Sequence, residues 1–214
     1  MKMIMFGPPG SGKGTYASGL SRELNIPHIS TGDMIREEIK NNTELGKKIE
    51  DYTKRGQLVP DDIVVEILQR RISQSDCRTG FILDGFPRTV PQAEALENTV
   101  KPDVVINLDV PDTIIMERLS TRLTCRNCGA IYNEHRLKPG ADRTCEKCGG
   151  QLYRRNDDQP QVIQERLKAY EKQTEPLIDY YRRKKLIETI RDREVWTPPE
   201  KIINQIINSI KARL

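Results

Sequence analysis

The sequence contains no run of apolar residues approaching the ~20 that a helix needs to cross a bilayer. Its opening stretch, MKMIMFGPPG, has an apolar segment too short for the core of a signal peptide. We therefore expect a cytoplasmic protein with no membrane partner. With 214 residues the chain can bury a sizeable core, and its length alone leaves open one domain with insertions or two domains.

Cysteine is sparse, and four of the five cysteines form two Cys-x-x-Cys pairs. In a reducing cytosol such pairs are typical of metal sites or redox groups rather than structural disulfides. The four residues are Cys125, Cys128, Cys145 and Cys148. Their spacing, C-x2-C-x16-C-x2-C, is that of a zinc ribbon and predicts a structural Zn²⁺ held by four thiolates, with a redox dithiol as the alternative. His135 would duplicate a complete ligand set, and Cys77 stands apart as an ordinary thiol.

A large excess of one charge is also missing, because 35 Lys and Arg face 31 Asp and Glu. The mildly basic balance suits polyanionic ligands and by itself allows a nucleic-acid binder. A zinc-ribbon protein that binds nucleic acid would need aromatic residues interleaved with basic ones around the ribbon. Only Tyr132 and Tyr153 are aromatic there. We therefore expect no nucleic-acid partner.

Short apolar strands alternate with helical patterns along most of the chain. The predicted strands are MKMIMF, GFILDGF, PDVVINLDV and KKLIETI, and helical patterns begin near Pro91 and Pro111. This order predicts an α/β fold with a parallel sheet covered on both faces. The last segment, TPPEKIINQIINSIKARL, predicts a helix that starts with Thr197 and Glu200 as a capping box.

The stretch GPPGSGKGT, residues 7–15, lies between a predicted strand and a predicted helix. It fits the phosphate-loop pattern G-x-x-x-x-G-K, with Gly14 before the hydroxyl residue Thr15. The glycines let backbone N–H groups converge on phosphate oxygens, and Lys13 supplies a charge for the outer phosphates. A glycine-rich turn with an incidental lysine is the alternative, which the strand–loop–helix order disfavours. The stretch predicts a nucleotide phosphate site.

Four further motifs follow in order: STGDMIR at 30–36, GQLVPD at 56–61, LDGFPRT at 83–89 with Gln92, and RRNDD at 154–158. Together with the phosphate loop, whose GKGT is the family's own form, they make the chain closely resemble the adenylate kinases over essentially its whole length. The resemblance implies a P-loop nucleoside monophosphate kinase core with a parallel five-stranded sheet. It also implies reversible phosphoryl transfer from MgATP to AMP, giving two ADP, in adenine nucleotide homeostasis.

The family's domain plan can be carried over to this chain. It implies a core domain of residues 1–29, 60–121 and 159–214. A helical AMP-binding insertion would span 30–59, and a zinc-containing lid would span 122–158. A monomer is expected because both insertions must open and close freely.

The resemblance also implies site residues. Those expected to contact ATP are Gly10, Ser11, Gly12, Lys13, Gly14, Thr15, Arg118, Arg122, Ile131 and Tyr132. Those expected to contact AMP are Thr31, Arg36, Gln57, Leu58, Val59, Gly85, Phe86, Pro87, Arg88, Gln92, Arg155 and Arg166. Those expected to act in catalysis are Lys13, Asp84, Arg88, Arg122, Arg155 and Arg166. Taken singly, each arginine would be interpreted as a solvated surface charge, and the adenine contacts near residues 193–196 stay unassigned.

Phosphoryl transfer between two polyanions explains why so many cations would be needed. Catalysis consists mainly of positioning and of stabilising charge on the moving oxygens. An acceptor phosphate, with a second pKa of about 6, is largely ionised at neutral pH, so no general base is required. Asp84 is expected to orient the hydrated Mg²⁺ that accompanies ATP, with a turn-forming role before Gly85 as the alternative.

The cysteine segment has few large apolar residues, namely Ile131, Tyr132, Leu137, Leu152 and Tyr153. Such a segment cannot form a sufficient core, and small modules of this kind are commonly stabilised by a metal. Zinc would make the lid one rigid body that closes over ATP and excludes water. A kinase using GTP as donor, or another monophosphate as acceptor, remains the nearest alternative function.

Overall fold

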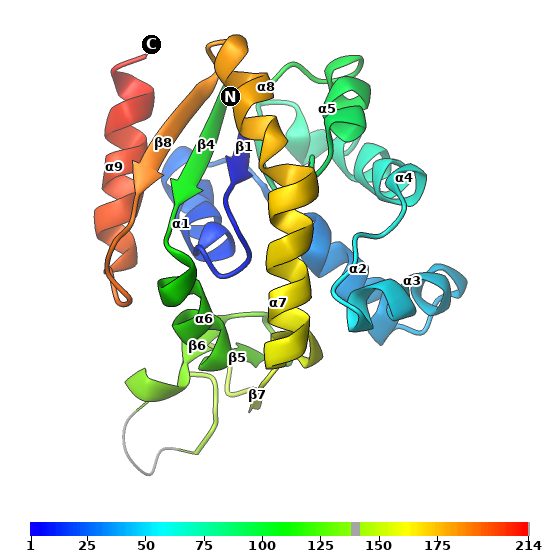
Figure 1. The fold of residues 1–214 in the computed structure, drawn as a ribbon, viewed down its shortest axis with the longest axis vertical. Coiled ribbons are helices and arrows are strands. Elements are labelled where there is room, and N and C mark those ends of the chain that lie inside the picture. Colours follow the sequence, from blue (N-terminus) through cyan, green and yellow to red (C-terminus); the bar gives the residue numbers. More distant parts are fainter. Residues whose placement is uncertain (138–141, 214) are drawn as a thin grey trace.

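The computed structural model describes residues 1–137 and 142–213. Its centre is a parallel five-stranded sheet in the order β2-β3-β1-β4-β8 (Figure 1). The strands are β1 (Lys2–Phe6), β2 (His28–Ser30), β3 (Phe81–Asp84), β4 (Val104–Asp109) and β8 (Ile187–Arg191). The predicted α/β fold with a parallel five-stranded sheet is therefore confirmed.

Helices cover both faces of the sheet, so both faces are buried. Alternate residues of a strand point to opposite sides, so each strand contributes to two cores. On one side, Met3 and Met5 of β1 belong to a core shared with α1 (Lys13–Leu24), α6 (Asp112–Ser120) and α9 (Pro199–Lys211). On the other side, Ile4 and Phe6 join a second core. That core is completed by α2 (Thr31–Lys40), α3 (Glu44–Lys54), α4 (Asp61–Ile72), α5 (Val90–Glu97) and α8 (Pro176–Arg183).

The structure adds one strand that the sequence did not predict and corrects the predicted start of the last helix. Strand β2 escaped notice because its three residues hold a single apolar side chain, Ile29, and it exists through pairing with β3. The predicted capping box at the start of α9 is wrong. The helix is capped at Pro198 without a side-chain hydrogen bond, and the Thr197 hydroxyl instead donates to Asp192 Oδ1 at 2.5 Å.

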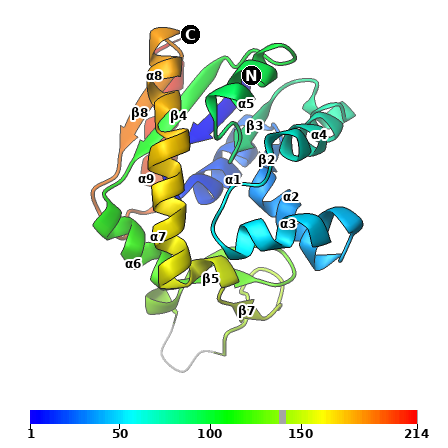
Figure 2. The same ribbon diagram turned by 45° about the vertical axis from the view of Figure 1, so that its right-hand side comes forward.

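Two segments extend beyond the carboxyl ends of the central strands (Figure 2). The first carries α2 and α3. The second carries an antiparallel sheet of β6 (Ile131–Asn133), β5 (Arg122–Cys125) and β7 (Leu152–Tyr153). Residues 138–141 of the expected lid lie outside the described residues.

The second segment returns to the core through α7 (Pro160–Ala169), which continues through a π-helical turn at Tyr170–Thr174 into α8. Figure 1 shows α7 and α8 as one continuous rod, yellow to orange, that runs beside the central sheet. Within the described part of the chain, no helix combines the length and apolar character needed to cross a membrane.

Candidate active site

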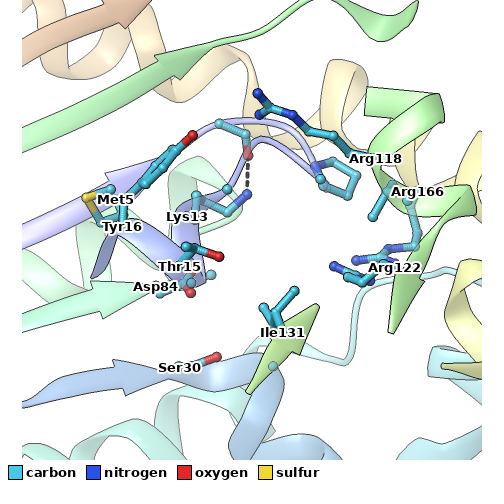
Figure 3. Close-up of a pocket in the computed structure, with 18 of the residues that line it drawn as sticks. Met5, Lys13, Thr15, Tyr16, Ser30, Asp84, Arg118, Arg122, Ile131 and Arg166 are labelled. Carbon is cyan, nitrogen blue, oxygen red and sulfur yellow. Dashed lines mark hydrogen bonds between the residues drawn. The ribbon is translucent and has the colours of Figure 1, made fainter. Parts of the chain in front are cut away.

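The loop between β1 and α1 wraps around the side chain of Lys13. Its Nζ donates to the carbonyl oxygens of Gly7 at 2.6 Å and Pro8 at 2.9 Å (Figure 3). Gly12 has φ of 96°, in the region that favours glycine, and a Cβ there would lie 2.6 Å from the Tyr16 ring. The glycines predicted from the sequence thus permit a turn that places Lys13 at the start of α1.

The environment of Lys13 disfavours its positive charge. Burial, together with the nearby cations Arg88, Arg166 and Arg122, lowers the pKa of Lys13 to about 8, although Asp84 opposes the shift. Figure 3 shows Lys13, Thr15 and Asp84 on one side of an opening, with Arg122 and Arg166 facing them across it. A polyanion placed between the two sides would relieve this repulsion.

The arginines come from separate elements, and each is held by oxygen atoms of the protein. Arg88 Nε donates to the Gly85 carbonyl at 2.7 Å, and Arg155 Nε donates to Thr124 Oγ1 at 2.8 Å. Arg36 pairs with Asp33 one helical turn earlier. These contacts fix the guanidinium groups before any ligand arrives, which is the condition for electrostatic preorganisation.

Asp158, fully buried at its side chain, forms ion pairs with two arginines. Arg122 Nε donates to its Oδ2 at 2.8 Å, and Arg166 Nη1 lies 3.5 Å from Oδ1. Arg166 Nη1 also lies 2.9 Å from Asp157 Oδ2. The two aspartates belong to the RRNDD motif, but sequence analysis assigned them no role.

The carboxylates do not neutralise the cluster. Burial first, and then neighbouring arginines, lower the pKa of Arg155 to about 10, and burial likewise lowers that of Arg166 to about 10. Burial also lowers the pKa of Arg88. Burial alone would raise the pKa of Asp157, but the arginines, led by Arg166, hold it below its usual range. The site therefore retains a positive potential that favours phosphate groups.

A cavity of about 540 Å³ brings the six predicted catalytic residues together. The predicted ATP contacts also line it, with the exception of Ser11, which is fully buried beneath the loop. A second hollow, of about 1300 Å³, is lined by the predicted AMP contacts other than Phe86 and Pro87. Phe86 is buried in the core, and Pro87 lines the first cavity. Arg36, Arg88, Arg155 and Arg166 line both.

Asp84 ends β3 directly beside the phosphate loop. Its Oδ2 lies 3.3 Å from His28 Nε2, and a Cβ on Gly14 would be 3.4 Å from the same oxygen. The carboxylate thus faces the floor of the first cavity. Sequence analysis did not identify His28, because one histidine at a strand start carries no motif.

The loop that follows β8 supplies another wall of the first cavity, through Val195, Trp196 and Thr197. Arg118 holds this loop, because its guanidinium donates to the Val195 carbonyl at 3.0 Å and the Glu194 carbonyl at 2.6 Å. The stretch 193–196, which the sequence left without a role, therefore lies beside Arg118 in the wall of the first cavity.

Asp192 joins this loop to α1 and α6. Its carboxylate, buried in the core, accepts from Arg118 Nη2 at 2.7 Å, from the Tyr16 hydroxyl at 3.1 Å and from Thr197 Oγ1. No local pattern marks Asp192 in the sequence, since two of its three partners, Tyr16 and Arg118, come from distant segments.

The four cysteines of the second segment converge as their spacing predicts. Their sulfur atoms all lie within 4.8 Å of one another. Cys125 and Cys148 Sγ are 3.5 Å apart, and Cys128 and Cys145 Sγ are 3.6 Å apart. A tetrahedron with Zn–S bonds of ~2.3 Å has sulfur atoms about 3.8 Å apart, whereas a disulfide would need ~2.05 Å. The donor set therefore fits a four-thiolate metal ion.

The two Cys-x-x-Cys turns have matching backbone hydrogen bonds. Gly129 N–H donates to the Cys125 carbonyl at 3.1 Å, and Gly149 N–H donates to the Cys145 carbonyl at 2.8 Å. The two glycines have φ of 70° and 71°, so each turn uses a conformation that favours glycine. Both halves of the predicted ribbon are thus formed by the same local geometry.

Comparisons with known proteins agree with this arrangement. A family model described as adenylate kinase matches residues 5–186. The chain is 48% identical to a protein named adenylate kinase from Archaeoglobus fulgidus, with 96% of this chain and 99% of that protein aligned. It is 51% identical to one from Caldicellulosiruptor bescii, covering 87% and 89% of the two chains. It is 47% identical to one from Methanocella arvoryzae, covering 100% and 98%.

Proposed function

The chain belongs to the adenylate kinase family, which converts ATP and AMP into two ADP, and we propose how its residues divide this reaction between two adjoining sites. The observation that carries the proposal is the set of arginines common to both hollows. The arginines that line both the cavity of the phosphate loop and the hollow beside α2 and α3 are Arg36, Arg88, Arg155 and Arg166. A phosphoryl group passing from one to the other would remain among the same cations.

The first cavity is the proposed donor site. Backbone N–H groups of Gly10 to Thr15 would bind the phosphates of ATP at the start of α1. Lys13 would exchange its present carbonyl contacts for the outer phosphates, with Arg122 opposite it. Arg118 would lie beside the base, against the wall formed by Val195 and Trp196, with Ile131 and Tyr132 covering the nucleotide from the lid.

The second hollow is the proposed acceptor site. Thr31, the backbone around Gln57 to Val59, and Gln92 line its inner part and would bind the nucleoside of AMP. Arg36 and Arg88 would bind its phosphate, held in place by Asp33 and the Gly85 carbonyl. The acceptor phosphate would then lie next to Arg155 and Arg166.

The transfer step needs fixed positive charge rather than a base. Charge that develops on the transferring oxygens would be stabilised by Lys13, Arg88 and Arg122, which stand on different sides of the opening. Mg²⁺ bound with ATP would supply positive charge that partly neutralises the phosphates. Asp84, at the floor of the cavity, would accept hydrogen bonds from the waters of the hydrated ion.

The domain plan expected from the family is proposed as well. Residues 30–59 would close over AMP, and residues 122–158 over ATP, with Zn²⁺ on the four cysteines giving the lid its rigidity. Because thiolate sites persist in reducing compartments, we assign the enzyme to the cytoplasm. We further propose that it acts as a monomer, since both moving segments need free space.

The arginine assignments can be tested directly. Arg88→Ala and Arg122→Ala should each lower turnover at saturating substrates at least about a hundredfold, because removing one preorganised donor typically costs ~2.7–4 kcal/mol in the transition state. Thermal unfolding should change little for Arg88→Ala, whereas Arg122→Ala leaves the buried Asp158 carboxylate with Arg166 as its remaining charged partner and should also lower the melting temperature. Arg70→Ala, which removes an exposed arginine of α4 paired with Glu66, is the matched control and should keep normal turnover. If either site variant retained more than about a tenth of normal turnover, its role would be wrong.

Substrate choice can be settled in the same coupled assay of ADP formation. We expect ATP with AMP to exceed ATP with GMP, CMP or UMP. Replacing ATP by GTP tests the donor site separately, since the donor base would be contacted through stacking and backbone groups. Equal rates with another monophosphate would favour a related nucleoside monophosphate kinase.

A further inference from the structure

The side-chain amide of Gln92 is buried at the acceptor hollow and held from two directions. Gln92 is 2% exposed and lines the hollow. Its Oε1 accepts the backbone N–H of Arg88 at 2.6 Å. Its Nε2 donates to Asp61 Oδ1 at 2.6 Å.

The chemistry of the two partners allows only one orientation of this amide. A backbone N–H can donate but not accept, and an ionised carboxylate can accept but not donate. Rotating the Gln92 amide by 180° would place its NH₂ against the Arg88 N–H and its oxygen against the Asp61 carboxylate. Both contacts would become repulsive, so the positions of oxygen and nitrogen are fixed by Arg88 and Asp61.

Asp61 is itself held in place. Its Oδ2 accepts from Thr89 Oγ1 at 2.9 Å, and the same hydroxyl oxygen accepts the Gln92 backbone N–H at 3.2 Å as the N-cap of α5. Asp61 also begins α4 directly after the GQLVP segment that lines the hollow. The carboxylate therefore connects the start of α4 to the N-cap of α5, the helix that carries Gln92.

After these contacts the amide retains one N–H and one oxygen lone pair for a ligand. Adenine presents a 6-amino donor beside an acceptor nitrogen, whereas a 6-oxo purine such as hypoxanthine presents an acceptor beside a donor. A freely rotating amide could pair with either edge. An amide fixed in one orientation matches only one of them, and a mismatch leaves buried polar groups unpaired.

We propose that Asp61 is a specificity-determining positioning residue, which fixes the Gln92 amide so that the acceptor site accepts a 6-aminopurine nucleotide and rejects its 6-oxo counterpart. The inference rests on the proposed function, in which Gln92 faces the acceptor base. Asp61 acts through Gln92 and contacts no reacting atom.

The test compares AMP with IMP, which differ only at this edge of the purine. The measured quantity is the ratio of kcat/KM for AMP to that for IMP, with ATP saturating. Asp61→Ala should lower this ratio at least about tenfold, because the amide loses its charged partner and only the Arg88 N–H then opposes its rotation toward IMP. Asp61→Asn should give an intermediate ratio, since asparagine keeps one acceptor oxygen. The KM for ATP should stay unchanged in both.

Asp62→Ala is the matched control. Asp62 is the other acidic residue in the first turn of α4 and is exposed, so its removal has the same effect on the helix end without touching Gln92. Its ratio should equal that of the unmodified enzyme. Gln92→Ala should lose most of the AMP preference.

The outcomes separate this inference from the proposed function. An unmodified enzyme that makes no ADP from ATP and AMP would contradict the proposed function. An active enzyme whose ratio is unchanged in Asp61→Ala or in Gln92→Ala would overturn the inference alone. Equal loss with AMP and IMP, accompanied by a lower melting temperature, would overturn it too, because it would show a purely structural role for Asp61.

Discussion

The two segments beyond the carboxyl ends of the sheet are stabilised in opposite ways. The first, with α2 and α3, contributes Ile35, Ile49 and Val59 to the same core that contains Ile4 and Phe6 of β1. The second has a small cluster of its own, whose buried members among the described residues are Leu123, Cys125, Cys145 and Leu152. Half of that cluster consists of cysteines placed for a metal.

This difference shows two ways to anchor a segment beside one active site. The first segment gains stability by extending an existing hydrophobic core, so its loss should propagate into the core. The second has too few apolar residues for that, and its four clustered thiolates would supply the missing stabilisation by binding a metal. Substitutions confined to one segment should therefore have different effects on stability, zinc content and nucleotide binding than substitutions confined to the other.

The largest effect is expected from removing two ligands of the lid. Cys145→Ser with Cys148→Ser should abolish stoichiometric zinc, because a hydroxyl is a poor substitute for a thiolate and two ligands cannot close a tetrahedron. The melting temperature and the ATP affinity should both fall, since Arg122 and Arg155 belong to the loosened segment. AMP binding and part of the low-temperature activity should survive. Zinc analysis, titration with each nucleotide and a melting curve check this.

A catalytic metal would give a different result. Activity would then fall in proportion to the zinc removed at every temperature, while the melting temperature stayed the same. That combination would contradict the structural role of the four thiolates and the contrast between the two segments.

The next effect in size concerns the first segment. Ile49→Ala should lower the free energy of unfolding by ~2–5 kcal/mol, because Ile49 is fully buried in the core shared with β1. Zinc content should remain normal. Tyr52→Ala, on the same helix but 37% exposed, should change stability far less. Denaturant unfolding of the two variants provides the measurement, and equal losses would show that α3 is not anchored through its buried face.

The smallest effect is a shift in pH dependence. The pKa of Lys13 lies at about 8, and the protonated amine is the form that attracts phosphate, so kcat/KM for ATP should fall as pH rises above that value. The two serine substitutions should loosen the lid, expose Lys13 to water and increase the distance between Arg122 and Lys13. Both changes raise its pKa toward the ordinary value, so the decline should begin at a higher pH.

Ile49→Ala should leave this decline where it is, because α3 does not contribute to the shift of Lys13. The check is kcat/KM for ATP between about pH 6 and 10 in all three proteins. A decline at the same pH in the lid variant, or one moved to lower pH, would contradict the assigned cause of the Lys13 shift.

Sequence analysis identified the parts of the site that lie on continuous stretches. The phosphate loop and the two Cys-x-x-Cys turns are determined by glycines at fixed positions and by the residues next to them, so their geometry depends little on the rest of the chain. Four of the five strands of the central sheet were also predicted, because each has its own apolar run. Strand β2 has no such run and depends on β3 for its hydrogen bonds.

The capping box failed for a related reason. Thr197 and Glu200 have the right spacing, but Asp192 takes the Thr197 hydroxyl. Asp192 is buried there because it also binds Arg118 and Tyr16, which approach from α6 and α1. A local pattern cannot register a competitor whose position depends on distant elements.

The sequence by itself determined the family, the phosphate loop and the four thiolates, because each is encoded by contiguous residues whose spacing sets their geometry. Only the tertiary structure decided which carboxylates hold which arginines, how far burial lowers the pKa of Lys13, and that Asp61 fixes the amide of Gln92. These properties arise between residues far apart in the chain. They depend on distance and on exclusion of water, and both exist only once the chain has folded.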